Sequence, residues 1–270
     1  MIHWDVNPEI FSLDIGFDIL HVRWYGVLFA LSFLIGYQIF EWMYKRENKR
    51  REELADLLWY MMLGTVIGAR LGHCLFYNPG YYLSHPLEIL YVWHGGLASH
   101  GAAIGILISL YLYTKKVKTT SYLWLLDRMV ITVALAGFFI RMGNLFNSEI
   151  VGMPSDMPWA FLFVNSSVYG DVPRHPAQLY EAIGYLIIFI IIFFLYKNKY
   201  KKLKDGFIFG IFLTLVFSYR FFIEYFKVPQ IEFNADLPLR MGQMLSIPLV
   251  IYGIYLMYVK RPPSSETVQK

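Results

Sequence analysis

The sequence predicts an all-α, polytopic membrane protein with about seven transmembrane helices. Of its 270 residues, 57% are hydrophobic and only 16% are charged, and the mean hydropathy is +0.44. Soluble domains are closer to a quarter charged. Apolar stretches near the ~20 residues that a helix needs to cross the hydrocarbon core recur along the chain. No internal repeat or separate soluble domain is visible, so we expect one integral-membrane domain over residues 1–270.

Seven segments fit a membrane-spanning helix, and many begin or end with aromatic residues, which favour the headgroup zone. The residues before the first span alternate apolar and acidic side chains without a basic start, which predicts an interfacial segment rather than a signal peptide. Residues 142–176 are too few to fold alone and could form a small extracytoplasmic cap. The predicted spans are Trp24–Tyr44, Leu54–Tyr77, Gly96–Tyr113, Leu123–Arg141, Ala177–Tyr196, Gly206–Phe226 and Gln243–Val259.

Loop charges predict the orientation of these spans. Sixteen of the 24 Lys and Arg residues follow the first, third, fifth and seventh spans, whereas three lie in the loops on the other side. Cytoplasmic loops carry the excess of positive charge, so we expect the N-terminus outside and the C-terminus in the cytoplasm. In this orientation, polar residues from several spans share one depth near the outer leaflet. Asp127 and Arg128, near the inner end of the fourth span, are exceptions.

The stretch IRMGNLFNSEIVG, residues 140–152, combines a cation, two amides and a carboxylate at the end of the fourth span. Ionisable groups at such a boundary are by default candidates for function. The planar fork of Arg141 matches phosphate oxygens, so a lipid phosphate is its natural ligand. The alternative is an arginine that snorkels to the interface. Asn144, Asn147 and Glu149 nearby favour the site, and Gly152 suits a chain that turns closely around a ligand.

Other polar residues allow both functional and structural interpretations. Arg220 lies within the sixth span, four residues before Glu224, and the two either serve a site or form an ion pair that makes the helix insertable. Arg70 is a similar case with no obvious local partner. His100 could be a general base or a packed histidine. Tyr25 could bind a headgroup or belong to the aromatic belt, while Gln178 and Glu181 could simply connect helices.

Several classes of function are disfavoured. The single cysteine, Cys74, excludes an intrachain disulfide, and the histidine spacing gives no reason to expect a metal. No basic-aromatic pattern suggests nucleic acid. The seventh span has no lysine for a retinal Schiff base, and Ser99 beside His100 cannot form a Ser–His pair on a helix because adjacent residues diverge. An anion or lipid transporter with buried arginines remains an alternative.

The polar stretch and six further motifs resemble the prolipoprotein diacylglyceryl transferases of bacterial membranes. Ile140 replaces a usual glycine and Leu145 a usual phenylalanine, but no polar group is lost. His100 is followed by Gly-Ala where Gly-Gly is frequent. The resemblance covers most of the chain in the right order, through RWYG at Arg23, GARLGHCLFY at Gly68, HGGLASHG at His94, RHPAQLYE at Arg174, the Arg220/Glu224 pair and MGQMLS at Met241.

The resemblance implies transfer of the diacylglyceryl group of phosphatidylglycerol to the lipobox cysteine of preprolipoproteins, without a cofactor. The thiol becomes a thioether and glycerol phosphate leaves. It further implies a multi-pass protein of the bacterial cytoplasmic membrane, in contact with membrane lipids, whose active site faces the outer leaflet. By the same resemblance, His100, Glu149, Arg220 and Glu224 are catalytic, with the base either His100 or Glu149. Phosphatidylglycerol is bound through Arg141, with support from Tyr25, Asn144, Gly152 and Arg70.

Overall fold

The computed structural model describes residues 1–14, 19–92, 96–228 and 239–259. His94, which belongs to one of the quoted motifs, lies outside these residues. The predicted all-α class is confirmed, because long helices make up most of the chain. Within the described residues, six helices are long and apolar enough to cross a membrane: α1 (Trp24–Arg46), α2 (Arg51–Phe76), α5 (Tyr122–Phe146), α6 (Ala177–Lys199) with η3 (Tyr200–Lys202), α7 (Phe207–Ile223) with η4 (Glu224–Phe226), and α8 (Met241–Tyr258).

Each of the seven predicted spans coincides with one helix, and every start agrees to within three residues. The predicted third span corresponds to α4 (Ser99–Val117), which has 19 residues but is not among the six helices above. The clearest difference is at the end of α5, which continues to Phe146, five residues beyond the predicted end at Arg141. Half of the polar stretch is therefore helical, which fixes the spacing of its side chains.

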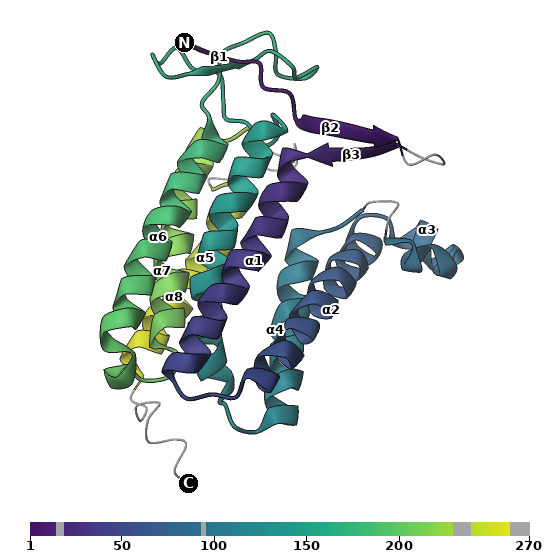
Figure 1. Ribbon diagram of the computed structural model, residues 1–270. Coiled ribbons are helices and arrows are strands. Elements are labelled where there is room, and N and C mark those ends of the chain that lie inside the picture. The colour runs from purple at the N-terminus through teal and green to yellow at the C-terminus, as the bar shows by residue number, and fades with distance from the viewer. Residues whose placement is uncertain (15–18, 93–95, 229–238, 260–270) are drawn as a thin grey trace. The chain divides into compact units, whose positions relative to one another are not determined.

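The chain divides into two compact units, Met1–Ile39 with Leu126–Lys270, and Phe40–Leu125. In the first unit, α6, α7 and α8 pack in chain order, and α1 and α5 run alongside them (Figure 1). The segment before α1 forms strands, which the sequence did not indicate. Strand β2 (Glu9–Asp14) pairs antiparallel with β3 (Ile19–Arg23). Strand β1 (Ile2–Trp4) pairs parallel with β4 (Phe161–Phe163), within the predicted cap.

A small apolar core holds the residues of the predicted cap together. Leu145, Val151, Phe161 and Phe163 are each at most 6% exposed, and Trp4 packs against them. This core joins the end of α5 to β4 and to the first strand of the chain. The polar stretch therefore continues into a packed structure and not into a loose loop.

The buried charges at the other end of α5 stabilise the fold. The Asp127 carboxylate accepts hydrogen bonds from the backbone N–H groups of Gly206 (2.9 Å) and Phe209 (2.7 Å), at the start of α7. A carboxylate at a helix N-terminus satisfies orphan donors and interacts favourably with the helix dipole. The Arg128 guanidinium lies 5.6 Å from the centre of the Tyr196 ring. These two exceptions to the outer-leaflet pattern thus have a structural explanation.

The second unit contains α2, α3 (Pro79–Ser84), η1 (Pro86–Leu90) and α4. Helix α4 approaches α2 closely through small residues. A Cβ atom added at Gly101 would lie only 2.3 Å from the Gly68 carbonyl oxygen of α2. The two backbones are therefore in direct contact, as small residues permit in membrane helix pairs.

Candidate active site

The site in the first unit begins on the last turns of α5. Arg141 and Asn144 are three residues apart on this helix, so both project from one face. Arg141 Nη1 donates a hydrogen bond to Asn144 Oδ1 (3.3 Å). Asn144 in turn donates through Nδ2 to Glu149 Oε1 (2.9 Å), and Asn147 Nδ2 donates to the same oxygen (3.2 Å). The sequence-predicted cluster of Arg141, Asn144, Asn147 and Glu149 is one hydrogen-bonded chain of side chains.

The backbone around Glu149 is held in an unusual conformation. Ser148 and Ile150 have φ angles of 53° and 58°, in the left-handed region that a β-branched residue such as isoleucine rarely adopts. The Glu149 N–H donates to the Asn144 carbonyl oxygen (3.0 Å), and the Glu149 carbonyl accepts from Gln178 Nε2 (2.7 Å). Strained backbone of this kind persists where surrounding contacts over-determine it, which is typical of functional sites.

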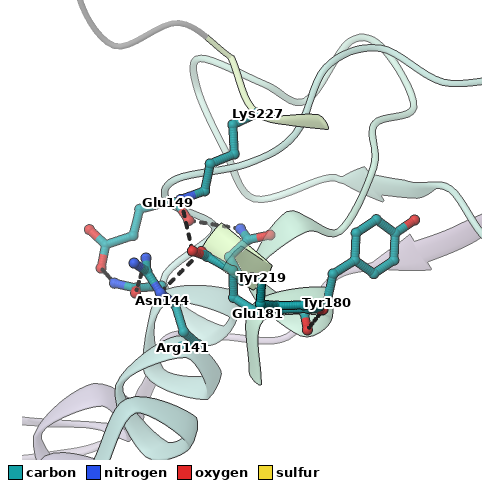
Figure 2. Close-up of polar contacts among 8 residues, drawn as sticks. Arg141, Asn144, Glu149, Tyr180, Glu181, Tyr219 and Lys227 are labelled. Carbon is teal, nitrogen blue, oxygen red and sulfur yellow. Dashed lines mark hydrogen bonds and ion pairs between the residues drawn. The ribbon is translucent and has the colours of Figure 1, made fainter. Parts of the chain in front are cut away.

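The centre of the site is a carboxylate between two cations. Glu181, on α6, is 1% exposed, and Figure 2 shows Arg141 and Lys227 reaching it from opposite sides. Arg141 Nε lies 3.1 Å from Glu181 Oε2, and Lys227 Nζ donates to Glu181 Oε1 at 2.9 Å. Two cations therefore share one fully buried carboxylate. Their guanidinium and ammonium groups are the kind of donors that bind an anion such as a phosphate.

Burial lowers the pKa of the Lys227 ammonium below that of an ordinary lysine, and the positive charge of Arg141 lowers it further. The Glu181 carboxylate opposes this shift by favouring the charged form. A bound anion would favour the charged ammonium of Lys227 in the same way as Glu181 does.

Arg220 and Glu224 belong to the same cluster but do not form an ion pair with each other within the described residues. Helix α7 ends at Ile223, and Glu224 begins the next turn, η4. A Cβ atom added at Gly242, on α8, would lie 2.7 Å from the Glu224 carboxylate, so this carboxylate packs against α8. Arg220 and Arg141 both interact electrostatically with the Tyr185 hydroxyl, to which Arg141 also hydrogen-bonds. Arg220 thus faces the site.

Three backbone segments, around Gly152, His175 and Lys227, meet closely at Gly152. Its N–H donates to the His175 carbonyl (2.9 Å), and it forms a bridge with Lys227. A Cβ atom there would lie 2.5 Å from the His175 carbonyl oxygen and 2.8 Å from the Phe226 carbonyl oxygen, so only glycine fits. Gly143 has a related role, because a Cβ atom there would lie 2.6 Å from Cδ2 of the Tyr25 ring. Tyr25 therefore lies against α5, within electrostatic range of Arg141 and Glu149.

Two predicted site residues, Arg70 and His100, belong to the second unit. The Arg70 guanidinium donates to the carbonyl oxygens of Ile89 (3.0 Å) and Glu88 (2.6 Å), so it fastens η1 to α2. The His100 side chain lies against the rings of Phe76 and Tyr77 on α2, with centroid distances of 5.4 and 5.8 Å. Thus the local partners that the sequence did not reveal for Arg70 are backbone carbonyls.

An open apolar groove runs between α7 and α8, with a volume of about 240 Å³. Phe221 and Phe222, which directly follow Arg220, form part of its wall, together with Ser218, Ser246, Ile247, Val250 and Ile251.

Among the described residues, no three His, Cys, Asp or Glu side chains lie close enough together to hold a metal ion. The site therefore offers cations, amides and carboxylates beside an apolar surface.

The sequence interpretation underestimated two residues. From the sequence, Glu181 could simply connect helices, and Lys227 is one of the three basic residues in the loops on the outer side. One feature of the sequence could have indicated a role for Glu181 in the site: it lies three residues after Gln178, so both polar side chains project from one face of α6. Lys227 carried no such signal, since the backbone crossing at Gly152 brings it to the site.

The chain is similar to known proteins over almost its whole length. The family described as prolipoprotein diacylglyceryl transferase matches residues 11–259. A relative from Chloroherpeton thalassium, named phosphatidylglycerol–prolipoprotein diacylglyceryl transferase, is 48% identical over 95% of this chain and 93% of its own length. Relatives with the same name from Tolumonas auensis and Bacteroides fragilis are 46% and 44% identical, again over 95% of this chain, and over 96% and 94% of their own lengths. The chain belongs to the prolipoprotein diacylglyceryl transferase family.

Proposed function

We propose that this enzyme transfers the diacylglyceryl group of phosphatidylglycerol to the lipobox cysteine of preprolipoproteins, the first step of lipoprotein maturation. The observation that supports the proposal is the pair of cations, Arg141 and Lys227, which share the buried Glu181 carboxylate and can donate to the phosphate of an anionic headgroup. The family membership supports the same reaction, and relatives named as transferases over nearly the whole chain disfavour the transporter alternative.

The reaction requires a thiolate and a stabilised leaving group. The cysteine sulfur attacks the carbon of the diacylglyceryl group that is bonded to the phosphate oxygen. A C–S bond forms, and the bond between this carbon and the phosphate oxygen breaks. Glycerol phosphate leaves with the electron pair, and the thiol proton passes to a base. A free thiol has a pKa near 8.5, so a base accelerates the attack. Fixed cations aimed at the phosphate stabilise the charge that develops on the leaving oxygen.

The contacts suggest a role for each residue in the first unit. Arg141 and Lys227 bind the phosphate, and Glu181 keeps both side chains in place. Arg220 stabilises the leaving oxygen, while Glu224 fixes the start of α8 beside it. Supporting positions are taken by Tyr25, Asn144 and Gly152, which hold the Arg141 side chain and the Lys227 backbone. The apolar groove between α7 and α8 suits one acyl chain of the lipid.

The base is either Glu149 or His100. Glu149 is exposed, and one of its carboxylate oxygens accepts hydrogen bonds from Asn144 and Asn147. His100 is exposed in the second unit, and histidine is the side chain that most often acts as a general base. The two candidates are distinguished by replacing each with glutamine and measuring the pH dependence of kcat/KM. Loss of the base should abolish the fall in kcat/KM at acidic pH, whereas loss of the other residue should leave that fall in place. Arg70 acts indirectly, through the η1 segment that it fastens.

We further propose that the site faces the outer leaflet of the bacterial cytoplasmic membrane, with residues 142–176 as an extracytoplasmic cap. The distribution of loop charges supports this orientation. Single cysteines placed at Ser155 and at Lys201, in a Cys74→Ala background, should react with an impermeant reagent from opposite sides of the membrane. Reaction from the same side would refute the orientation.

The transferase proposal is tested with purified protein, labelled phosphatidylglycerol and a lipobox peptide. Label should reach the peptide thiol with the parent protein and not with Arg141→Ala, which removes the phosphate ligand. The matched control is Arg128→Ala, which removes a cation at the other end of α5. Failure of the parent to label the peptide, or full activity of Arg141→Ala, would show that the proposal is wrong.

A further inference from the structure

Two amide side chains flank Glu149 and share an unusual feature. Asn147 uses Nδ2 to donate to the Glu149 carboxylate (3.2 Å), and Gln178 uses Nε2 to donate to the Glu149 carbonyl (2.7 Å). The remaining amide oxygens, Asn147 Oδ1 and Gln178 Oε1, are buried and have no hydrogen-bond partner within the described residues. Gln178 as a whole is 0% exposed. Buried acceptors in native structures normally have a partner, so two unpaired ones in one place call for a donor.

The orientation of both amides follows from their donors. Turning either amide over would place its oxygen against an oxygen of Glu149, which has no hydrogen to share. The nitrogen of each amide is therefore committed to Glu149, and its oxygen points to a second position. A ligand or water at that position must donate a hydrogen bond.

These oxygens lie in the same polar cluster as the proposed phosphate site. Gln178 is three residues before Glu181 on α6, so the two side chains share one face of the helix. Asn147 and Asn144 donate to the same Glu149 oxygen, and Asn144 also accepts from Arg141. Glu149 therefore connects the two amides, and Asn144 connects Glu149 to Arg141.

The acceptors indicate the kind of donor. Each is a neutral amide oxygen, to which a neutral hydroxyl can donate without adding charge to the site. A glycerol headgroup has two hydroxyls beyond its phosphate, one for each acceptor.

We propose that Gln178 Oε1 and Asn147 Oδ1 accept hydrogen bonds from the two hydroxyls of the phosphatidylglycerol headgroup, and that these residues determine headgroup specificity. The inference rests on the proposed function, since it assumes that the phosphate lies at Arg141 and Lys227. It assigns to Gln178 a part in substrate recognition beyond the connection of helices.

The test compares phosphatidylglycerol with phosphatidylpropanol of the same acyl chains, which keeps the phosphate and its charge but lacks both hydroxyls. An analogue that leaves a buried partner unpaired is disfavoured about 5- to 150-fold, so the parent should show at least about tenfold higher kcat/KM for phosphatidylglycerol. Gln178→Met keeps the side-chain length and removes the acceptor. This variant should lose most of that preference, chiefly through slower use of phosphatidylglycerol.

Ser32→Ala is the matched control, because it also removes a buried polar group, one that bonds only to the Phe29 carbonyl within α1 in the described structure. It should keep the parental preference. Equal use of both lipids by the parent, as expected if water satisfies the two oxygens, would overturn the inference. An unchanged preference in Gln178→Met would also overturn it.

A variant that is inactive toward both lipids is examined by lipid-induced thermal stabilisation in detergent. The parent should be stabilised more by phosphatidylglycerol than by phosphatidylpropanol, and Gln178→Met should be stabilised equally by both. Retention of the difference in the variant contradicts the inference. Failure of the proposed function has a distinct signature: the parent and Ser32→Ala would transfer label from neither lipid, while the thermal comparison would still report headgroup selectivity.

Discussion

Replacement of Glu181 by glutamine tests the energetic centre of the site. The substitution keeps the shape of the side chain and removes the only charge that lies between Arg141 and Lys227 in the described structure. Glu181 is 1% exposed, so solvent cannot replace it. Breaking a buried ion pair by removing one partner costs about 3–5 kcal/mol. We therefore expect the free energy of unfolding of Glu181→Gln to fall by about 3–5 kcal/mol.

A second substitution shows whether this loss comes from the unpaired cations. The double variant Glu181→Gln/Lys227→Met removes one of the two cations that pair with Glu181, and the other, Arg141, keeps its hydrogen bonds to Asn144 and Tyr185. The double variant should therefore be more stable than Glu181→Gln alone, although it carries one more substitution. The assay is thermal unfolding in detergent at neutral pH, with phosphatidylglycerol absent.

Glu41→Gln is the control, because Glu41 pairs with the exposed side chains of Lys45 and Arg51, and such pairs contribute about 1 kcal/mol or less. A Glu181→Gln variant as stable as Glu41→Gln would refute the account. So would a double variant less stable than Glu181→Gln, since the damage would then not come from uncompensated positive charge.

Three further predictions concern the backbone crossing, the far end of α5 and the titration of the site. Gly152→Ala should lower stability by about 1–3 kcal/mol and reduce transfer, because its Cβ would lie 2.5 Å from the His175 carbonyl oxygen; Gly26→Ala, with open space at its Cβ position, should not lower thermal stability. Asp127→Asn should lower the melting temperature through a loss of roughly 1–2 kcal/mol at the α7 N-terminus, with kcat/KM of the folded protein unchanged, because about 20 Å of helix separates it from the site. Burial lowers the pKa of Lys227, so stabilisation by phosphatidylglycerol should decline as pH rises, before the ~10.4 of an exposed lysine is reached. Lys227→Arg should abolish this decline because arginine stays charged, and a decline of equal size in that variant would assign it to another group.

The sequence was sufficient to predict the helices and part of the site. Apolar runs of span length fix where helices form, so each predicted start lies within three residues of the structure. Hydropathy could not fix the end of α5, because its last turns contain Arg141 and Asn144, which end an apolar run without ending a helix. Alternating apolar and acidic residues before Trp24 were equally ambiguous, and they form strands through pairing with each other and with residues 161–163.

The polar stretch was predicted as a site because its residues are close in sequence. The partners from other helices were harder to predict, since their positions depend on packing. Glu181 is the central residue because α6 lies against the end of α5, where Arg141 reaches it. Arg70 shows the opposite case, in which a buried arginine without a sequence neighbour of opposite charge turned out to bind carbonyl oxygens of a nearby turn.

In the proposed mechanism, the cations around Glu181 receive the phosphate of phosphatidylglycerol. An experimental structure of the protein with phosphatidylglycerol bound tests this directly. Phosphate oxygens should lie about 3 Å from the nitrogen atoms of both Arg141 and Lys227. A headgroup bound elsewhere, with Arg141 and Lys227 paired only to Glu181 as in the lipid-free structure, would contradict it.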